Sequence, residues 1–313
     1  MEYIGLQTQI RRNNIRSTWL LLSFPLLLSA MCWAIVFVIQ YKSARGEYPL
    51  EISTVNSAFL TVFPIILLVV GVWFLIAFKF HNWMIMSATG SKPLERTENK
   101  RVYNLVENLC ISQGIAVIPS IYIIYDDSLN AFASGIKEGN YAISLSQGMI
   151  NKLDDEELKA VISHELTHIQ NRDTRMLIIS IIFVGIFAFV AQMAMRTRFR
   201  SDKDKNGGVA IAIMLIAGLA YLVSLLMRFA ISRQREYMAD AGSAEMTKNP
   251  AALASALRKI SEDPCIEAVQ RKDIAQLFIE NPQVAEGSSI AWYQKIFSTH
   301  PPIDKRITYL EHL

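Results

Sequence analysis

Residues 153–173 read LDDEELKAVISHELTHIQNRD, and the interpretation of the whole chain starts from this stretch. It predicts a helix that begins after Asp154, because Asp154 can cap the N-terminus and Glu157 stands where it would complete a capping box. The acidic first turn also suits the positive end of the helix dipole. We expect this helix to continue through both histidines toward Asn171.

His164 and His168 are separated by one helical turn, so both imidazoles lie on one face roughly 6 Å apart and can reach a single ion. Zinc accepts two imidazoles and one carboxylate, and it keeps a fourth position for water. Glu165 stands beside that position and is the candidate general base for this water. The alternative is a surface helix with two solvated histidines, although the chain has only five histidines in all.

A third ligand has to come from elsewhere, and residues 232–240 (SRQREYMAD) hold the best candidates. Glu236 and Asp240 are one helical turn apart, so one can bind the metal while the other orients a ligand histidine. An ordinary charged helix face is the alternative, and the stretch taken alone would favour it.

Hydrophobic residues make up 52% of the 313 residues, and the mean hydropathy is +0.26. The excess lies in four runs of about 20 residues, the length of a helix that crosses a bilayer. We therefore expect a mainly α membrane protein with about four transmembrane helices; helices buried in a large soluble core are the alternative. The first run is too long for a cleaved signal peptide and is interpreted as an anchor. The runs are Trp19–Ile39, Phe59–Phe78, 176–195 and Val209–Met227.

The polar parts of the chain predict an α+β domain. Helices are expected at 97–112 and 251–260, and the β-prone residues 120–125 and 141–145 are expected to pair as in a hairpin. The division that follows is an N-terminal tail (1–16), two transmembrane helices (17–80), the first part of the domain (81–175), a transmembrane hairpin (176–227) and the second part of the domain (228–313).

Helix geometry supports a shared site. His168 lies eight residues before Met176, where the third run begins, and Glu236 lies nine residues after Met227, where the fourth ends. If both runs continue as helices, each residue rises about 12–13 Å above the membrane boundary. An antiparallel pair of helices would present both side chains at one height, close to the bilayer surface.

These residues resemble the M48 family of zinc metallopeptidases, and most of all its bacterial HtpX-type membrane branch. The resemblance covers residues 88 to 313, and its matching pieces occur in the order expected for the family. They are NAFASG (130–135), HELTHIQNRD (164–173), SRQREYMAD (232–240), LFIENP (277–282) and STHPP (298–302) followed by Arg306-Ile307.

The resemblance implies a zincin-like domain with one Zn²⁺ per chain. His164, His168 and Glu236 would be its ligands, with Glu165 as the general base and Asp240 beside the ligands. His300 would steady the oxyanion, whereas the residues alone favour a surface histidine before a Pro-Pro turn. An edge strand would hold the substrate as an added strand, with a plain turn as the alternative. That strand consists of Asn130, Ala131, Phe132 and Ala133.

Basic residues indicate which side of the membrane the domain faces. Arg11, Arg12 and Arg16 precede the first run, which favours an N-terminus and a catalytic domain in the cytosol. The resemblance implies that the membrane is a bacterial inner membrane. The loop after the third run is also basic, from Arg196 to Lys205. Either this later signal is overridden, or the last two runs do not fully cross.

The expected function is therefore a zinc-dependent endopeptidase that cleaves misfolded or damaged membrane proteins at the cytosolic face. A net charge of +3 without a dense basic stripe gives no indication of a nucleic-acid partner. The alternative is a membrane scaffold or chaperone-like protein with structural zinc. An intramembrane protease fits less well, because residues 163–175 are polar, and a transporter fits less well because no charge interrupts the runs.

Overall fold

The structure is a computed structural model that describes residues 6–43, 51–200, 214–219, 221, 233–262 and 301–313. The chain divides into two compact units. We call residues 1–15, 80–178 and 229–313 the mixed unit, and residues 16–79 and 179–228 the helical unit.

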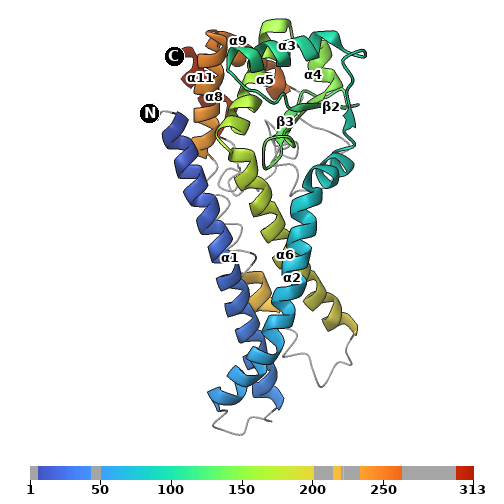
Figure 1. Cartoon of the computed structure of the whole chain (residues 1–313), viewed down its shortest axis with the longest axis vertical. Coiled ribbons are helices and arrows are strands. Elements are labelled where there is room, and N and C mark those ends of the chain that lie inside the picture. Colours follow the sequence, from blue (N-terminus) through green and yellow to red (C-terminus); the bar gives the residue numbers. More distant parts are fainter. Residues whose placement is uncertain (1–5, 44–50, 201–213, 220, 222–232, 263–300) are drawn as a thin grey trace. The chain divides into compact units, whose positions relative to one another are not determined.

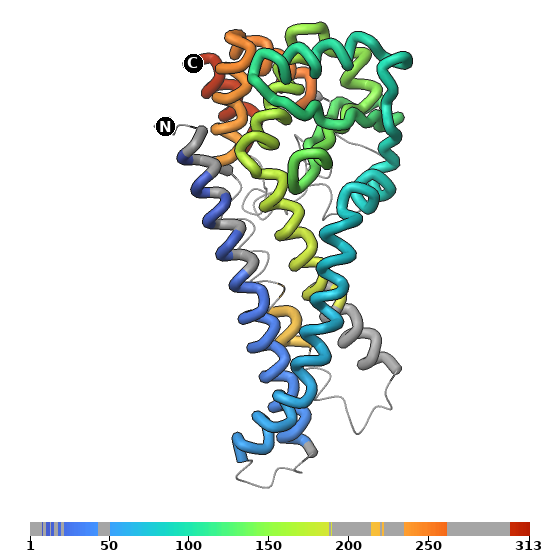
Figure 2. The backbone as a smooth tube through the Cα atoms, in the orientation of Figure 1, coloured from blue at the N-terminus to red at the C-terminus, as the bar shows by residue number. Residues whose placement is uncertain are grey.

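Long apolar helices build the helical unit. α1 (Leu6–Ser43), α2 (Ile52–Thr89) and α6 (Asp173–Arg200) supply it, and Figure 2 follows α2 as one unbroken tube. Its small core is aromatic: the rings of Phe24 and Phe183 stack with their centroids 3.9 Å apart.

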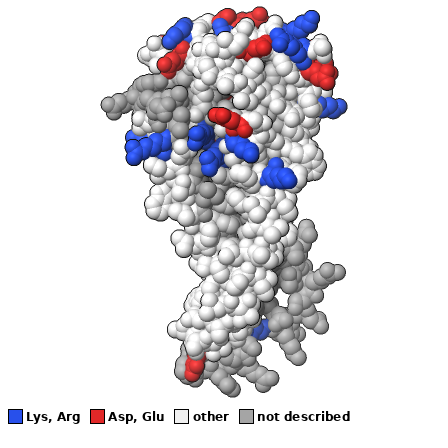
Figure 3. Space-filling model, in the orientation of Figure 1, with Lys and Arg blue, Asp and Glu red and all other residues white. Residues whose placement is uncertain are grey.

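Two segments are long and apolar enough to cross a membrane by length and composition, Leu22–Lys42 and Ile52–Thr89. Many of their large apolar side chains are exposed, for example Leu26 at 71% and Leu68 at 68%. Such a surface suits contact with lipid better than contact with water. On the face shown in Figure 3, few charged side chains lie along the helical unit.

The expected third and fourth spans lie only partly within the described residues. α6 runs through the third run as a helix, but side chains are described only for its first part. Of the fourth run, residues 214–219 and 221 are described, and they are helical. The four-span architecture therefore stays a prediction.

The mixed unit contains one four-stranded sheet in the order β1-β2-β4-β3. β2 and β4 are parallel, with Ser120 opposite Ala142, whereas β3 is antiparallel to β4. The predicted hairpin of residues 120–125 and 141–145 was therefore wrong, because the connection forms a third strand that pairs with β4 and reverses the chain. The bounds are β1 Lys92–Pro93, β2 Ser120–Ile124, β3 Ala131–Ser134 and β4 Ala142–Ser146.

Helices cover this sheet and bury its apolar side chains (Figure 1). α5 begins where its sequence predicted: Asp154 accepts a hydrogen bond from the Glu157 N–H, and Glu157 accepts one from the Asp154 N–H. The bounds are α3 Lys100–Ser112, α4 Gln147–Lys152, α5 Asp155–Gln170, α8 Arg233–Thr247, α9 Pro250–Glu262 and α11 Ile303–Glu311.

α8 packs closely against α5 at a glycine. A Cβ atom on Gly242 would lie only 2.5 Å from Cγ2 of Thr167. One residue later, the Ser243 hydroxyl donates a hydrogen bond of 2.7 Å to the Ala160 carbonyl. The close approach and the hydrogen bond fix the register of the two helices, and so the position of α8 side chains relative to those of α5.

Candidate metal centre

Helix α5 brings the two histidines of the HELTH stretch together. His164 and His168 lie on the same face, and their Nε2 atoms are 3.2 Å apart. The rings are nearly perpendicular, at 89°. His164 is fully buried, and 14% of the His168 side chain is exposed. Both Nε2 atoms thus lie next to one small volume. Because part of the His168 side chain is exposed, solvent can reach this volume from one side.

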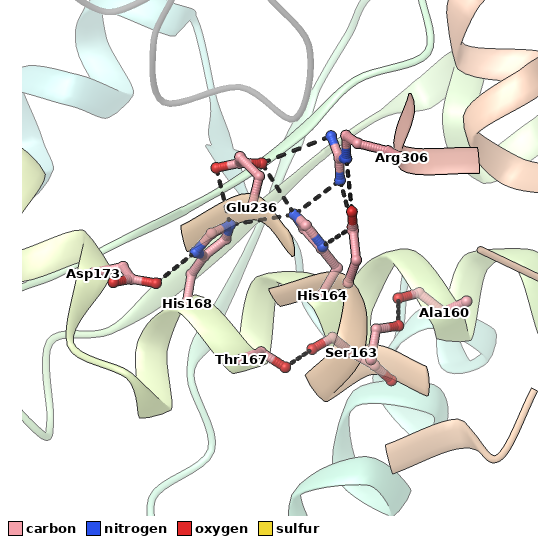
Figure 4. A network of polar contacts seen from close by, with 10 residues as sticks. Ala160, Ser163, His164, Thr167, His168, Asp173, Glu236 and Arg306 are labelled. Carbon is pink, nitrogen blue, oxygen red and sulfur yellow. Dashed lines mark hydrogen bonds and ion pairs between the residues drawn. The ribbon is translucent and has the colours of Figure 1, made fainter. Parts of the chain in front are cut away.

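Helix α8 supplies the third donor to the same volume (Figure 4). One Glu236 carboxylate oxygen lies 3.7 Å from Nε2 of His164, and the other lies 3.6 Å from Nε2 of His168. A tetrahedral zinc ion with bonds of about 2.0–2.1 Å separates its ligand atoms by about 3.3 Å. The observed spacings are close to that value, so the three side chains form a possible metal site.

A separate aspartate stands behind each histidine. Asp240 Oδ1 lies 3.1 Å from Nδ1 of His164, and Asp173 Oδ2 lies 2.9 Å from Nδ1 of His168. A carboxylate at Nδ1 favours the tautomer whose Nε2 lone pair faces the metal. Of the two acidic residues on α8, the structure thus places Glu236 beside both Nε2 atoms and Asp240 beside Nδ1 of His164.

Asp173 is the last residue of the HELTHIQNRD motif, but no role for it was predicted from the sequence. Arg172 before it has φ of 61°, so α5 ends in a left-handed turn and α6 begins at Asp173. That turn brings Asp173 back beside His168. A carboxylate five residues after the second histidine was the available signal, but without the turn its spacing did not predict contact.

Arg306 was missed as well. It projects from α11 into the centre, is fully buried, and contacts both Asp240 and Glu236 (Figure 4). The family resemblance included Arg306-Ile307, but nothing in the sequence predicted this contact, because α11 lies far along the chain from α5 and α8.

Glu165 connects the centre to the sheet. The side chain is buried, and the main-chain N–H of Ala133 in β3 is close enough to lower the pKa of its carboxyl. Among the described residues, β3 is one of the two edge strands of the sheet, although all four of its residues are buried. Asn130, just before it, is buried too, and its N–H donates to the Ser146 hydroxyl at 3.0 Å.

Burial and charge set the protonation of these groups in opposing ways. Burial lowers the pKa of His164, but the Asp240 and Glu236 carboxylates outweigh it and raise that pKa to about 9. Burial raises the pKa of Asp240, but Arg306 and His164 outweigh it and hold that pKa below its ordinary value. The metal-free site therefore favours a cation between its carboxylates.

Burial also raises the pKa of Glu165, and this outweighs the two histidines and the Ala133 N–H, which lower it. A raised pKa makes this carboxylate a stronger base than an exposed glutamate. His300 and residues 277–282 lie outside the described residues.

The model of peptidase family M48 matches residues 96–313, about two thirds of the chain. The chain belongs to peptidase family M48. This M48 peptidase is 53% identical over 321 residues to a protease HtpX homolog of Bacteroides fragilis (strain YCH46), covering 99% of each chain. A protease HtpX homolog of Dictyoglomus turgidum is 36% identical over 305 residues, covering 95% of this chain and 92% of the relative. It is therefore an HtpX-type protease of this metallopeptidase family.

The crystal structure of S. mikatae Ste24p is similar to the M48 peptidase with a TM-score of 0.45 and 20% identity. The match covers 88% of this chain and 61% of that one. The likeness is too weak to carry an argument about the site. Family membership and the two long apolar helices together indicate a membrane metallopeptidase.

Proposed function

We propose that this M48 peptidase is a zinc-dependent endopeptidase that binds one Zn²⁺ through His164, His168 and Glu236. The observation that carries the proposal is the convergence of these three donors at 3.2–3.7 Å, with the buried Glu165 on the same helix. Two imidazoles and one carboxylate are the donor set of a catalytic zinc site with one open position.

When bound, zinc would polarise the substrate carbonyl and lower the pKa of a water molecule. Glu165, buried on α5 beside His164, would accept a proton from that water and then return it to the leaving amine. Asp240 and Asp173 hold the imidazoles of His164 and His168 with their Nε2 atoms toward the ion. His300 is proposed to steady the oxyanion.

The substrate is proposed to bind as an extended strand beside β3, along Asn130, Ala131, Phe132 and Ala133. Two observations support this: β3 is at an edge of the described sheet, and the Ala133 main-chain N–H is close enough to Glu165 to lower the pKa of its carboxyl. A strand added there would lie next to the general base, and main-chain pairing would accept many sequences. Because β3 is buried, neighbouring groups must move before a peptide can pair with it.

The natural substrates are proposed to be misfolded or damaged membrane proteins, cleaved at the cytosolic face of a bacterial inner membrane. The support comes from the two apolar helices, from the basic residues near the N-terminus, and from the relatives named as HtpX homologs. A membrane scaffold with structural zinc is the second candidate. It is less favoured because the proposed donors are two histidines and one glutamate, whereas structural zinc sites are usually rich in cysteine.

The deciding experiment compares the purified full chain with Glu165→Gln, measuring zinc content and casein cleavage in detergent. We expect the variant to keep about one zinc per chain and to lose cleavage by a factor of about 10²–10⁴. Glu156→Gln, the same change at an exposed position of α5, should leave both quantities unaltered. If parent and variant both bind zinc and neither cleaves, the scaffold becomes the better reading.

A further inference from the structure

Arg306 places a positive charge deep in the candidate metal centre. Its side chain is among the largest that are fully buried, and it comes from α11, 66 residues after Asp240. Burying a guanidinium is costly unless charged partners surround it. The contacts of the Arg306 side chain therefore indicate which interactions compensate for its burial.

The guanidinium of Arg306 donates two parallel hydrogen bonds to the Asp240 carboxylate. Its Nε donates to Asp240 Oδ2 at 3.0 Å, and its Nη2 donates to Oδ1 at 2.7 Å. A fork of this kind fixes the plane of the carboxylate as well as its distance. Asp240 Oδ1 is also the atom that lies 3.1 Å from Nδ1 of His164. A continuous line of contacts thus runs from Arg306 through Asp240 to a ligand histidine.

The same guanidinium also balances the charge of the centre. Glu236 and Asp240 are two buried carboxylates one turn apart on α8. Arg306 Nη1 lies 3.7 Å from Glu236, and Nη2 lies 3.4 Å from Nε2 of His164. Another buried arginine in this region, Arg235, directs Nη1 to the Asp173 main-chain carbonyl at 3.4 Å. Of these two buried arginines, Arg306 is the one whose guanidinium contacts both carboxylates of α8.

α11 has its own anchors besides Arg306. Leu310 is buried in the core shared with α9, and Ile303 and Ile307 pack against that core. The Tyr309 ring meets the Tyr237 ring of α8 edge to face, with centroids 5.3 Å apart. These apolar contacts pack α11 against α9 and α8, and none of them requires a buried guanidinium.

We propose that Arg306 is a positioning residue for the metal site: it holds Asp240, and through Asp240 it fixes the ring of His164. The inference rests on the proposed zinc site and adds to it a dependence on the C-terminal helix. Assembly of the metal site is then complete only when α11 has docked.

The test measures the zinc dissociation constant of the full chain in detergent by competition with a chromogenic chelator. The variants are Arg306→Met, Arg306→Lys, Asp240→Asn and the double variant Arg306→Met/Asp240→Asn. We expect Arg306→Met to weaken zinc binding about 10- to 100-fold, the usual effect of removing a group that orients a ligand. Arg306→Lys keeps the charge but not the fork, so it should restore only part of the loss.

The double variant separates positioning from a general loss of packing. If Arg306 acts through Asp240, then Arg306→Met should weaken binding less than about threefold in the Asp240→Asn background. Val106→Ala in α3 is the matched control: it removes buried side-chain volume from the same core without altering α11, and it should lower the unfolding temperature while leaving zinc affinity within about twofold of the parent.

Three results would overturn the inference. They are equal zinc affinity in Arg306→Met and the parent, an equally large loss with and without Asp240, and a loss as large in Val106→Ala. A parent chain that binds no zinc would overturn the proposed metal site, and the role of Arg306 with it. The first three results leave the metal site itself standing.

Discussion

At the scale of single residues, the candidate centre holds each ligand histidine by a carboxylate of its own. Asp240 contacts His164 at 3.1 Å, and Asp173 contacts His168 at 2.9 Å. The two carboxylates come from different elements, α8 and the start of α6. The ring orientation of each histidine therefore depends on a separate piece of chain, and the two can be tested separately.

Asp173→Asn should weaken zinc binding about tenfold or more, because a neutral amide favours the donating form of Nδ1 less strongly than a carboxylate does. The measurement is the zinc dissociation constant of the detergent-purified chain. Asp127→Asn, the same change at an exposed site, serves as the control. Unchanged affinity in Asp173→Asn would show that its contact with His168 does not support the metal.

At the scale of elements, the site depends on how closely α8 approaches α5. A Cβ at Gly242 would meet Thr167 Cγ2 at 2.5 Å and Oγ1 at 2.7 Å, and the hydroxyl is already bonded to the Ser163 carbonyl at 2.8 Å. The Thr167 side chain cannot easily rotate away from such a Cβ atom, because Thr167 is β-branched and lies within a helix. The two helices therefore touch at Thr167, the residue directly before His168.

Gly242→Ala should destabilise the chain by about 1–3 kcal/mol, because overpacking pushes α8 away from α5. It should also weaken zinc binding, since Glu236 moves with α8. Thr167→Ala in the same chain should restore part of both losses. Gly185→Ala is the control, because nothing lies within 4 Å of the added atom. Thermal unfolding and chelator competition measure the effects, and wild-type behaviour of Gly242→Ala would contradict the packing argument.

The N-terminus of α5 is tied to α9 by a buried carboxylate. Glu157 lies 2.6 Å from Lys259 Nζ and accepts a hydrogen bond from Ser255 at 2.7 Å. Burial raises the pKa of Glu157, but the bonds from Lys259, Ser255 and the Asp154 main chain outweigh it and lower that pKa overall. A lowered pKa in the folded state means that the ionised carboxylate stabilises the fold.

Glu157→Gln should therefore lower stability by about 1 kcal/mol at neutral pH, a modest value because Lys259 is partly exposed. The stabilisation is present above the unfolded-state pKa of about 4.3 and is lost as the pH falls through the lower folded-state pKa. The gap in unfolding temperature between the parent and the variant should thus shrink as the pH falls below about 4.3. The exposed Glu156→Gln should show a smaller dependence, and a gap for Glu157→Gln that does not shrink in acid would contradict the assignment.

At the scale of the whole molecule, the helical unit presents apolar side chains outward and the mixed unit carries the metal centre. Exposed residues such as Leu26 and Leu68 would be costly in water and are favourable in lipid. The proposed topology places both ends and the catalytic part of the chain in the cytosol, with residue 207 on the far side.

Single-cysteine variants test this topology. In a chain without its three native cysteines, a cysteine at Gly207 should react with a membrane-impermeant maleimide in intact spheroplasts. A cysteine at Glu51 should react as well, and one at Glu156 should react only after the membrane is opened. Protection at position 207 alone would mean that the third and fourth runs do not fully cross.

Local sequence determined the parts of this protein whose interactions are local. The start of α5 followed from Asp154 and Glu157, and the common face of His164 and His168 followed from helical spacing, because the partners are a few residues apart. The apolar runs likewise predicted long helices from composition alone. The family motifs then pointed to Glu236, 68 residues after His168 in the chain.

Only the tertiary structure decided the rest, because those contacts join distant residues. The spacing of Glu236 and Asp240 does not by itself distinguish them, and the tertiary structure places Glu236 beside both Nε2 atoms and Asp240 beside Nδ1 of His164. The parallel pairing of β2 and β4 arises from a strand in their connection, and Arg306 reaches Asp240 only after α11 has docked. Side-chain periodicity encodes which face of an element is buried, but not which distant element covers it.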